Sequence, residues 1–135
     1  MKPKVISFLP AFILFLISFV LLVLPGSDIP KSNIFELIYF DKWVHIGMFG
    51  LLVIVWSYPF LKTGTGTKNI FGLITLAVIF YGVVMEFVQK YFAYQRSFDL
   101  IDILADATGA IFAFIFMVQQ LKKFNRDNLK KNEPL

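Results

Sequence analysis

The sequence has no cysteine, a single histidine and few charged side chains. Of its 135 residues, 16% are charged and 58% are hydrophobic, and phenylalanine alone occurs 17 times. The absence of cysteine excludes disulfide bonds and thiol chemistry. The lone histidine, His45, forms no HxxxH or HxxEH pair, and no DxD motif is present, so we expect neither a metal ion nor another cofactor.

The scarcity of charge also excludes a soluble domain of this size, since the mean hydropathy is +0.73. A chain of this length suggests a single domain, 1–135. Helices rise about 1.5 Å per residue, so a run of about 20 apolar residues crosses the hydrocarbon core of a bilayer. We therefore predict an all-α, four-helix transmembrane bundle and a charged tail at 122–135. The predicted spans are 5–24, 43–61, 70–90 and 99–121.

The first apolar run raises the alternative of a secretory signal peptide. The run has 20 uncharged residues, follows Lys2 and Lys4, and stops at Pro25-Gly26. A signal peptide has an apolar region of about 7–15 residues and a small-residue cleavage site, and neither fits here. We expect a retained helix, in which Pro10 kinks the chain or marks the first turns.

The connections between the runs differ in character. Residues 28–42 mix charged and apolar side chains, and their second half suits an amphipathic segment at the membrane interface. The turn at 62–68 contains GxG without a following GK[ST], which indicates a flexible link and not a phosphate site. The aromatic side chains flanking the second run are typical of interface belts: Tyr39, Trp43, Trp56 and Tyr58.

Basic residues predict the orientation in the membrane. Nine of the 13 lie in the amino-terminal segment, the 62–68 turn and the tail, and four lie in the other two loops, Lys42 among them. The positive-inside rule then places both termini in the cytoplasm. The basic tail meets anionic lipid, and no aromatic-interleaved basic module indicates nucleic acid binding.

Polar side chains gather near the opposite, outer face, and their spacing places them on helix faces. Asp41 and His45 are four residues apart. One stripe consists of Gly82, Glu86 and Gln89. A second stripe consists of Asp99, Asp102 and Asp106 and continues through Gly109 and Ala113. A small residue also stands at every fourth position in Ala105, Gly109 and Ala113. Small residues at that spacing let helices approach closely, so the acids should face the interior of the bundle.

These side chains are the candidate site. A charged group at the membrane centre costs about 2.5–3.5 kcal/mol on insertion scales, which favours a function for them. We expect Arg96 to hold Asp99 or Asp102, and His45 to share a proton with Glu86 as a candidate catalytic pair. A static ion-pair network that holds the helices in register remains an alternative. Ser97 and Ser57 lack the setting of a nucleophile. The candidate binding residues are Arg96, Asp99, Asp102, Gln89, Asp41 and Asp106.

Three segments in this order, DKWVHIGMFGLL, EFVQ and RSFDLIDILADATGA, resemble the VanZ-like family of small bacterial membrane proteins. The resemblance covers about residues 41–120. The residues that match the family's motifs are Asp41, Lys42, His45, Glu86, Gln89, Arg96, Asp102 and Gly109. Two positions depart from the pattern: Asp106 stands where the family usually has Asn, and Ala113 replaces a glycine.

The resemblance implies a protein of the bacterial cell envelope, located in the cytoplasmic membrane and associated with resistance to glycopeptides such as teicoplanin. The leading hypothesis is a site that binds or acts on a polar group, such as a lipid-linked cell-wall precursor. A proton-coupled transporter or channel subunit, which would require a homo-oligomer to enclose a path, is one alternative. A structural partner of another membrane protein is the other, and it would need only the packing face around Gly109.

Overall fold

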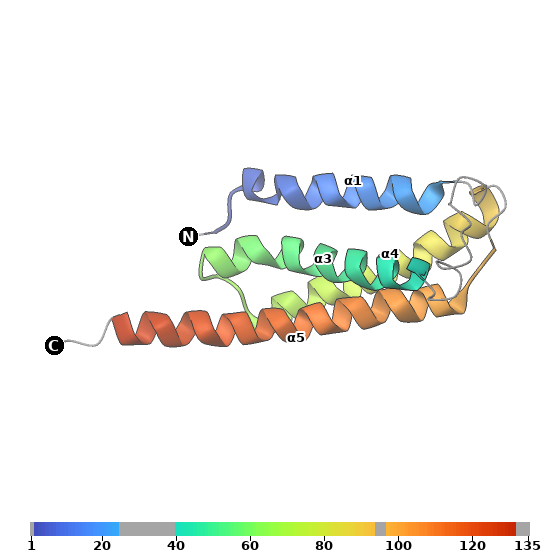
Figure 1. The fold of residues 1–135 in the computed structure, drawn as a ribbon. Helices are drawn as coiled ribbons and strands as arrows, with labels where there is room; N and C mark the ends of the chain where they lie inside the picture. The colour runs from blue at the N-terminus through green and yellow to red at the C-terminus, as the bar shows by residue number, and fades with distance from the viewer. Residues whose placement is uncertain (1, 25–39, 94–96, 132–135) are drawn as a thin grey trace.

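A computed structural model describes residues 2–24, 40–93 and 97–131, and within these ranges the chain is all-α (Figure 1). A short 3-10 turn, Val5–Phe8, leads into α1 (Leu9–Val23), and α3 (Phe40–Lys62), α4 (Lys68–Phe92) and α5 (Leu100–Lys131) follow. The turn with α1, and each of the three later helices, are long and apolar enough to cross a membrane. The predicted four-helix bundle is confirmed, and the chain is a multi-pass membrane protein.

The helix ends differ from the predicted spans in three places. Pro10 lies in the first turn of α1, directly after the 3-10 turn, so it marks the start of the helix. The helix α3 begins at Phe40, which brings Lys42 out of the expected loop and into the helix. The helix α5 continues to Lys131 through the first part of the expected tail. Tyr39 lies outside the described residues, and so does the expected interfacial segment up to residue 39; its last residues form the start of α3.

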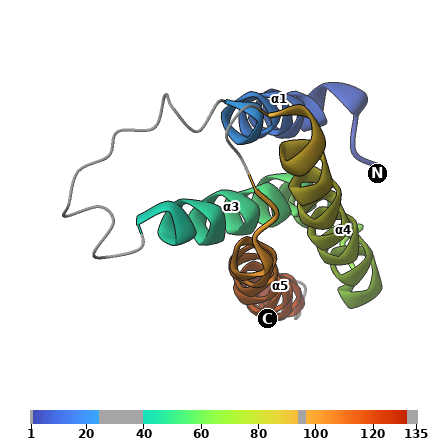
Figure 2. The same cartoon turned by 90° about the vertical axis from the view of Figure 1, so that its right-hand side faces the viewer.

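Consecutive helices run in opposite directions, and both described ends of the chain lie on one side of the bundle (Figure 1). The most extensive contact is between α3 and α5, and α4 packs against both. Among the described residues, α1 contacts α3 and α4 but not α5, and Figure 2 shows it on the side away from α5. The bundle is therefore a three-helix unit with α1 laid against it.

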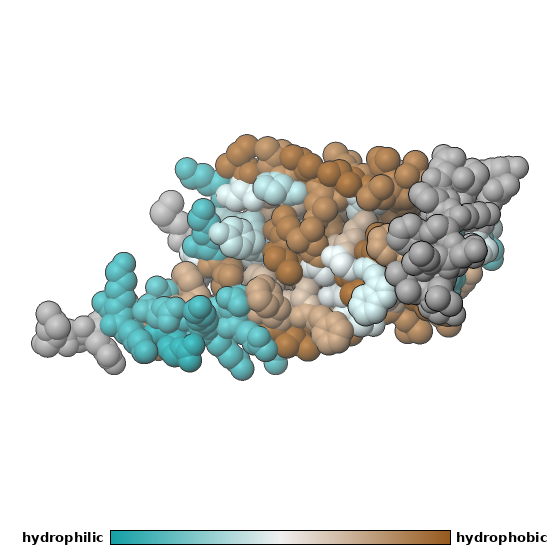
Figure 3. Space-filling view, viewed as in Figure 1, coloured by the Kyte–Doolittle hydropathy of each residue, from teal (hydrophilic) through white to brown (hydrophobic). Residues whose placement is uncertain are grey.

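Apolar side chains cover the outside of the bundle as well as its core. Phe49, Leu52 and Val53 of α3 are buried at its centre. Large side chains such as Phe80 and Phe112 are more than 60% exposed, and hydrophobic residues dominate the visible surface of the spans (Figure 3). A bilayer satisfies this surface, because lipid tails are as apolar as the side chains themselves.

The close approach of α3 and α5 depends on glycine. A Cβ atom on Gly109 would overlap the backbone carbonyl of Ile46, and one on Gly50 would lie 3.1 Å from the Gly109 carbonyl oxygen. The two backbones are thus in contact, as the small-residue spacing around Gly109 predicted. This contact places the amino-terminal turns of α3 and α5 side by side.

Candidate polar site

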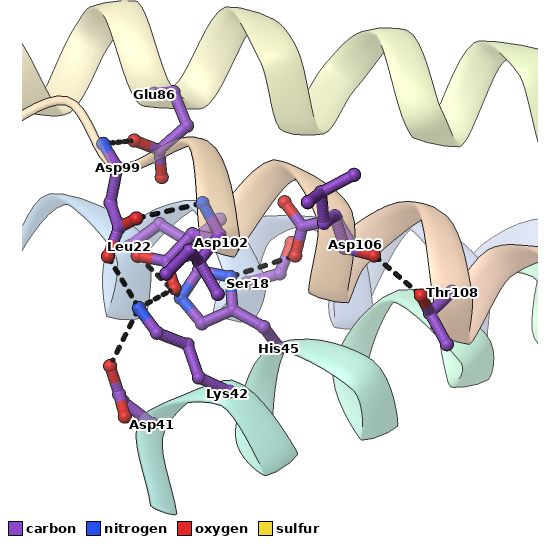
Figure 4. A network of polar contacts seen from close by, with 12 residues as sticks. Ser18, Leu22, Asp41, Lys42, His45, Glu86, Asp99, Asp102, Asp106 and Thr108 are labelled. Carbon is purple, nitrogen blue, oxygen red and sulfur yellow. Dashed lines mark hydrogen bonds and ion pairs between the residues drawn. The ribbon is translucent and has the colours of Figure 1, made fainter. Parts of the chain in front are cut away.

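A cluster of ionisable side chains, drawn in Figure 4, occupies the end of the bundle where α3 and α5 begin and α4 ends, opposite the described chain ends (Figure 1). Its members come from all three helices of the unit. Those with hydrogen bonds or ion pairs to one another are Asp41, Lys42, His45, Glu86, Asp99, Asp102 and Asp106. The cluster is contiguous, so the polar stripes predicted on separate helices meet.

Lys42 is the cation at the centre of this cluster. Its ammonium group donates a hydrogen bond of 2.7 Å to Oδ2 of Asp99 and another to Oδ1 of Asp102, and it lies 3.1 Å from Oδ2 of Asp41. The three carboxylates come from the starts of α3 and α5. Lys42 therefore ties the first turn of α5 to α3 by charge-assisted hydrogen bonds.

Asp99 caps the amino terminus of α5. Its Oδ1 accepts a hydrogen bond of 2.8 Å from the backbone N–H of Ile101, and its own N–H donates to Oε2 of Glu86 at 2.8 Å. The Lys42 hydrogen bond is the main cause of a lowered pKa at Asp99, which precedes the helix. A lowered folded-state pKa means that this interaction stabilises the fold at neutral pH and is lost as the pH falls through that pKa.

His45 and Asp106 form a buried pair one turn deeper. Nδ1 of His45 and Oδ1 of Asp106 are 2.8 Å apart, and Nε2 of His45 lies 4.0 Å from Oδ2 of Asp102. An ionised Asp106 can only accept, so Nδ1 is then the donor, and in the neutral imidazole Nε2 is the basic nitrogen. Phe49 stacks parallel to the imidazole, with ring centres 6.3 Å apart.

Gly82 makes room for the Asp106 carboxylate. A Cβ atom at this position would lie 2.6 Å from Oδ2 of Asp106 and 2.9 Å from the Phe49 ring. The carboxylate therefore rests directly against the backbone of α4. A glycine on the same stripe as Glu86 thus sets the position of an acid on another helix.

Two polar contacts fasten α1 to the unit near this site. The side-chain amide of Gln89 donates a hydrogen bond of 2.8 Å to the backbone carbonyl of Leu22. The hydroxyl groups of Ser18 and Tyr81 are 3.1 Å apart, and Ser18 also donates to the carbonyl of Phe15. Gln89 is fully buried, and its role is to hold α1 rather than to line the ion-paired cluster.

The structure pairs the predicted residues differently from the sequence interpretation. His45 bonds to Asp106 and not, as expected, to Glu86, whose carboxylate accepts from the start of α5. Lys42 occupies the place expected for Arg96, between Asp99 and Asp102. Arg96 itself lies outside the described residues, so its role stays a prediction.

Lys42 is the member of the cluster that the interpretation of the spacing missed. It was counted as a loop charge, although it lies three residues before His45 and therefore on the same helical face. Asp41, which was included, is the most exposed member of the cluster, and its ion pair within the described residues is with Lys42. The spacing of Lys42 and His45 was the signal that could have found it.

The described cluster carries more acid than base. Five carboxyl groups face one ammonium group and one imidazole, an arrangement suited to holding and passing protons at the edge of a bilayer. No group of three or more His, Asp or Glu side chains within the described residues is arranged to hold a metal ion. The fold and the cluster together define a small multi-pass membrane protein with an ion-paired site near one membrane face. Family models, curated proteins and solved structures give no match to this chain.

Proposed function

We propose that this chain is a VanZ-like protein of the bacterial cytoplasmic membrane, with both termini in the cytoplasm. Its polar cluster then lies at the outer face and binds or acts on the polar group of an envelope lipid, such as a lipid-linked cell-wall precursor. The observation that supports this proposal is that the three segments resembling the family lie close together in the fold. Residues from all three of them, Lys42 and His45, Glu86, and Asp102, lie in one contiguous cluster.

The proposed chemistry centres on His45. Asp106 fixes the imidazole so that Nε2 is free to accept a proton from a substrate hydroxyl or phosphate group. Lys42, held by Asp99 and Asp102, supplies the positive charge that orients an anionic group, and Arg96 is proposed to add a second. The Glu86 carboxylate accepts a hydrogen bond from the backbone N–H of Asp99 and so positions Asp99 at the start of α5.

Proton-coupled transport is a second candidate that a separate observation favours. Side-chain exposure falls along the series Asp99, Lys42, Asp102, His45 and Asp106, from 37% to 3%. This series leads from the membrane surface into the bundle, as a proton uptake path would. The structural-partner alternative is less favoured, because Gly109 already packs against Ile46 within the chain.

Glycopeptide susceptibility of cells expressing single-residue variants tests the leading proposal. His45→Ala should abolish any resistance at an unchanged level of membrane protein, since no other described imidazole can replace the base. Asp106→Asn should keep the function, because an amide oxygen still accepts from Nδ1, whereas Asp106→Ala should lose it. Asp41→Asn is the matched control, because Asp41 is half-exposed and its ion pair within the described residues is with Lys42, which keeps Asp99 and Asp102.

The same variants separate the two candidates. In proteoliposomes loaded with a pH-sensitive dye, transport predicts proton flux that Asp106→Asn abolishes, because an amide cannot carry a proton. An absence of flux together with a tolerated Asp106→Asn supports the binding or catalytic site. If His45→Ala has no effect on susceptibility at normal expression, the leading proposal is wrong.

A further inference from the structure

A groove lies along the α3–α5 contact and is lined by residues of both helices. It has a volume of about 350 Å³, and its lining includes Gly47, Gly50 and Gly109, with Phe112 and Phe116 beside them. The two phenylalanines are 66% and 45% exposed. The groove lies within the membrane-spanning part of both helices, so hydrocarbon is the environment it faces.

The α5 side of this groove runs directly into a basic surface. The residues Phe112, Phe116, Gln119, Lys123, Arg126 and Lys130 follow one another at alternating spacings of four and three, which places them on one helical face. The last three are exposed. The face therefore changes from apolar to cationic along a continuous helix.

This change coincides with the point where α5 leaves the bundle. Figure 1 shows α5 extending beyond the turn between α3 and α4, and Figure 3 shows this projecting end as hydrophilic. Phe124, on another face, lies near Gly64 of the turn, where a Cβ would be 3.5 Å from the ring. The protein thus contacts one side of the projecting helix and leaves the basic side exposed.

The α3 side of the groove has the same polarity. Gly47, Leu51, Ile54, Tyr58 and Lys62 share a face by spacing, so an interface tyrosine and a lysine lie at the same end of the groove as the basic surface of α5. Tyr58 is 53% exposed. Both walls therefore lead from hydrocarbon depth to cationic groups at the bilayer surface.

We propose that this face binds one anionic phospholipid of the leaflet on the side of the chain termini. One acyl chain lies in the groove, and the phosphate contacts the basic surface formed by Lys123, Arg126 and Lys130. Hydrocarbon depth excludes a polar occupant of the groove, and the cationic rim favours a negative headgroup over a zwitterionic one. The basic surface lies at the opposite end of the bundle from the polar cluster, and the proposal does not depend on the function proposed for that cluster.

Native mass spectrometry of the full chain in detergent tests the proposal, with phosphatidylglycerol and phosphatidylcholine of identical acyl chains as probes. We expect one phosphatidylglycerol to be retained preferentially. The combined variant Lys123→Gln, Arg126→Gln and Lys130→Gln should weaken that binding by roughly fivefold for each charge removed. These side chains are exposed, so the fold should tolerate their replacement.

A second variant tests the groove without changing charge. A Cβ on Gly47 meets no atom within 4 Å, so Gly47→Leu should fill the groove, leave the melting temperature unchanged and weaken phosphatidylglycerol binding by at least about tenfold. The charge-matched control is Lys2→Gln, Lys4→Gln and Lys68→Gln, which removes three exposed cations on the same side but off this face. It should change the binding by less than about twofold.

Three results would overturn the proposal. Equal retention of the two lipids would show that the headgroup is not recognised. An equal loss of binding in the control variant would show a general charge effect of the surface. A lipid-free dimer that Gly47→Leu abolishes would assign the groove to a second copy of the chain.

Discussion

The α3–α5 pair and helix α1 are attached to the bundle in different ways. The backbones of α3 and α5 touch at Gly109, and Lys42 connects them by ion pairs. In contrast, α1 has two polar contacts with α4, and a cavity of about 270 Å³ lies between its Phe15 and residues such as Trp56 and Tyr81. The polar site therefore belongs to the three-helix unit, and α1 is an outer helix that packs on α3 and α4 and makes two polar contacts with α4 within the described residues.

The largest test of this contrast is Gly109→Leu. Because even a Cβ would overlap the Ile46 carbonyl, the two helices must separate, and we expect a loss of more than about 4 kcal/mol in unfolding free energy and little protein in the membrane. Gly47→Leu is the matched control and should accumulate normally. Immunoblotting of membrane fractions measures the accumulation of both variants. Normal accumulation of Gly109→Leu as well as Gly47→Leu would contradict the close contact.

The second test is Lys42→Met, which removes the cation between α3 and α5. Asp102 is buried and would be left without its partner, so we expect a loss of about 3–5 kcal/mol, measured by denaturant titration in detergent. Adding Asp102→Asn should restore a large part of it, since the uncompensated charge is then gone. A double variant whose loss equals the sum of the losses of Lys42→Met and Asp102→Asn would show that the pair is not coupled.

Gly82→Ala is a smaller change at the α4 face of the site. The added methyl group meets the Asp106 carboxylate and the Phe49 ring, so we expect a loss of about 1–3 kcal/mol by overpacking. Gly72→Ala on the same helix meets only the Phe114 ring at 3.8 Å, and it should stabilise the protein by up to about 1 kcal/mol. Thermal unfolding of the two variants should therefore shift in opposite directions; shifts in the same direction would argue against a steric role for Gly82.

The sequence was sufficient for the fold because a spanning segment in lipid must satisfy its own backbone, so long apolar runs are helices. It was also sufficient for the faces of the helices. Glu86, Gln89, Asp102 and Asp106 share faces by spacing, and all four are buried.

The partners across helices could not be predicted in the same way. Spacing gives the face of one helix, but contacts depend on helix order and rotation, which the backbone approach at Gly109 sets. If α3 slid along its own axis, the same residues would still face the interior, but His45 would have a different neighbour on α5. The expected pair with Glu86 was therefore wrong, and Asp106 is the partner.

The smallest expected effect concerns the attachment of α1 through Ser18 and Tyr81. Hydrogen bonds between membrane helices average about 0.6 kcal/mol, so Ser18→Ala and Tyr81→Phe should each lose about that amount, and the double variant little more. A loss above about 2 kcal/mol for either single variant would show that α1 is bound as firmly as α5. Within the described residues α1 does not contact α5, so neither change should alter the effect of Lys42→Met. Additive losses when Lys42→Met is combined with either variant would show that α1 does not contribute to the polar site.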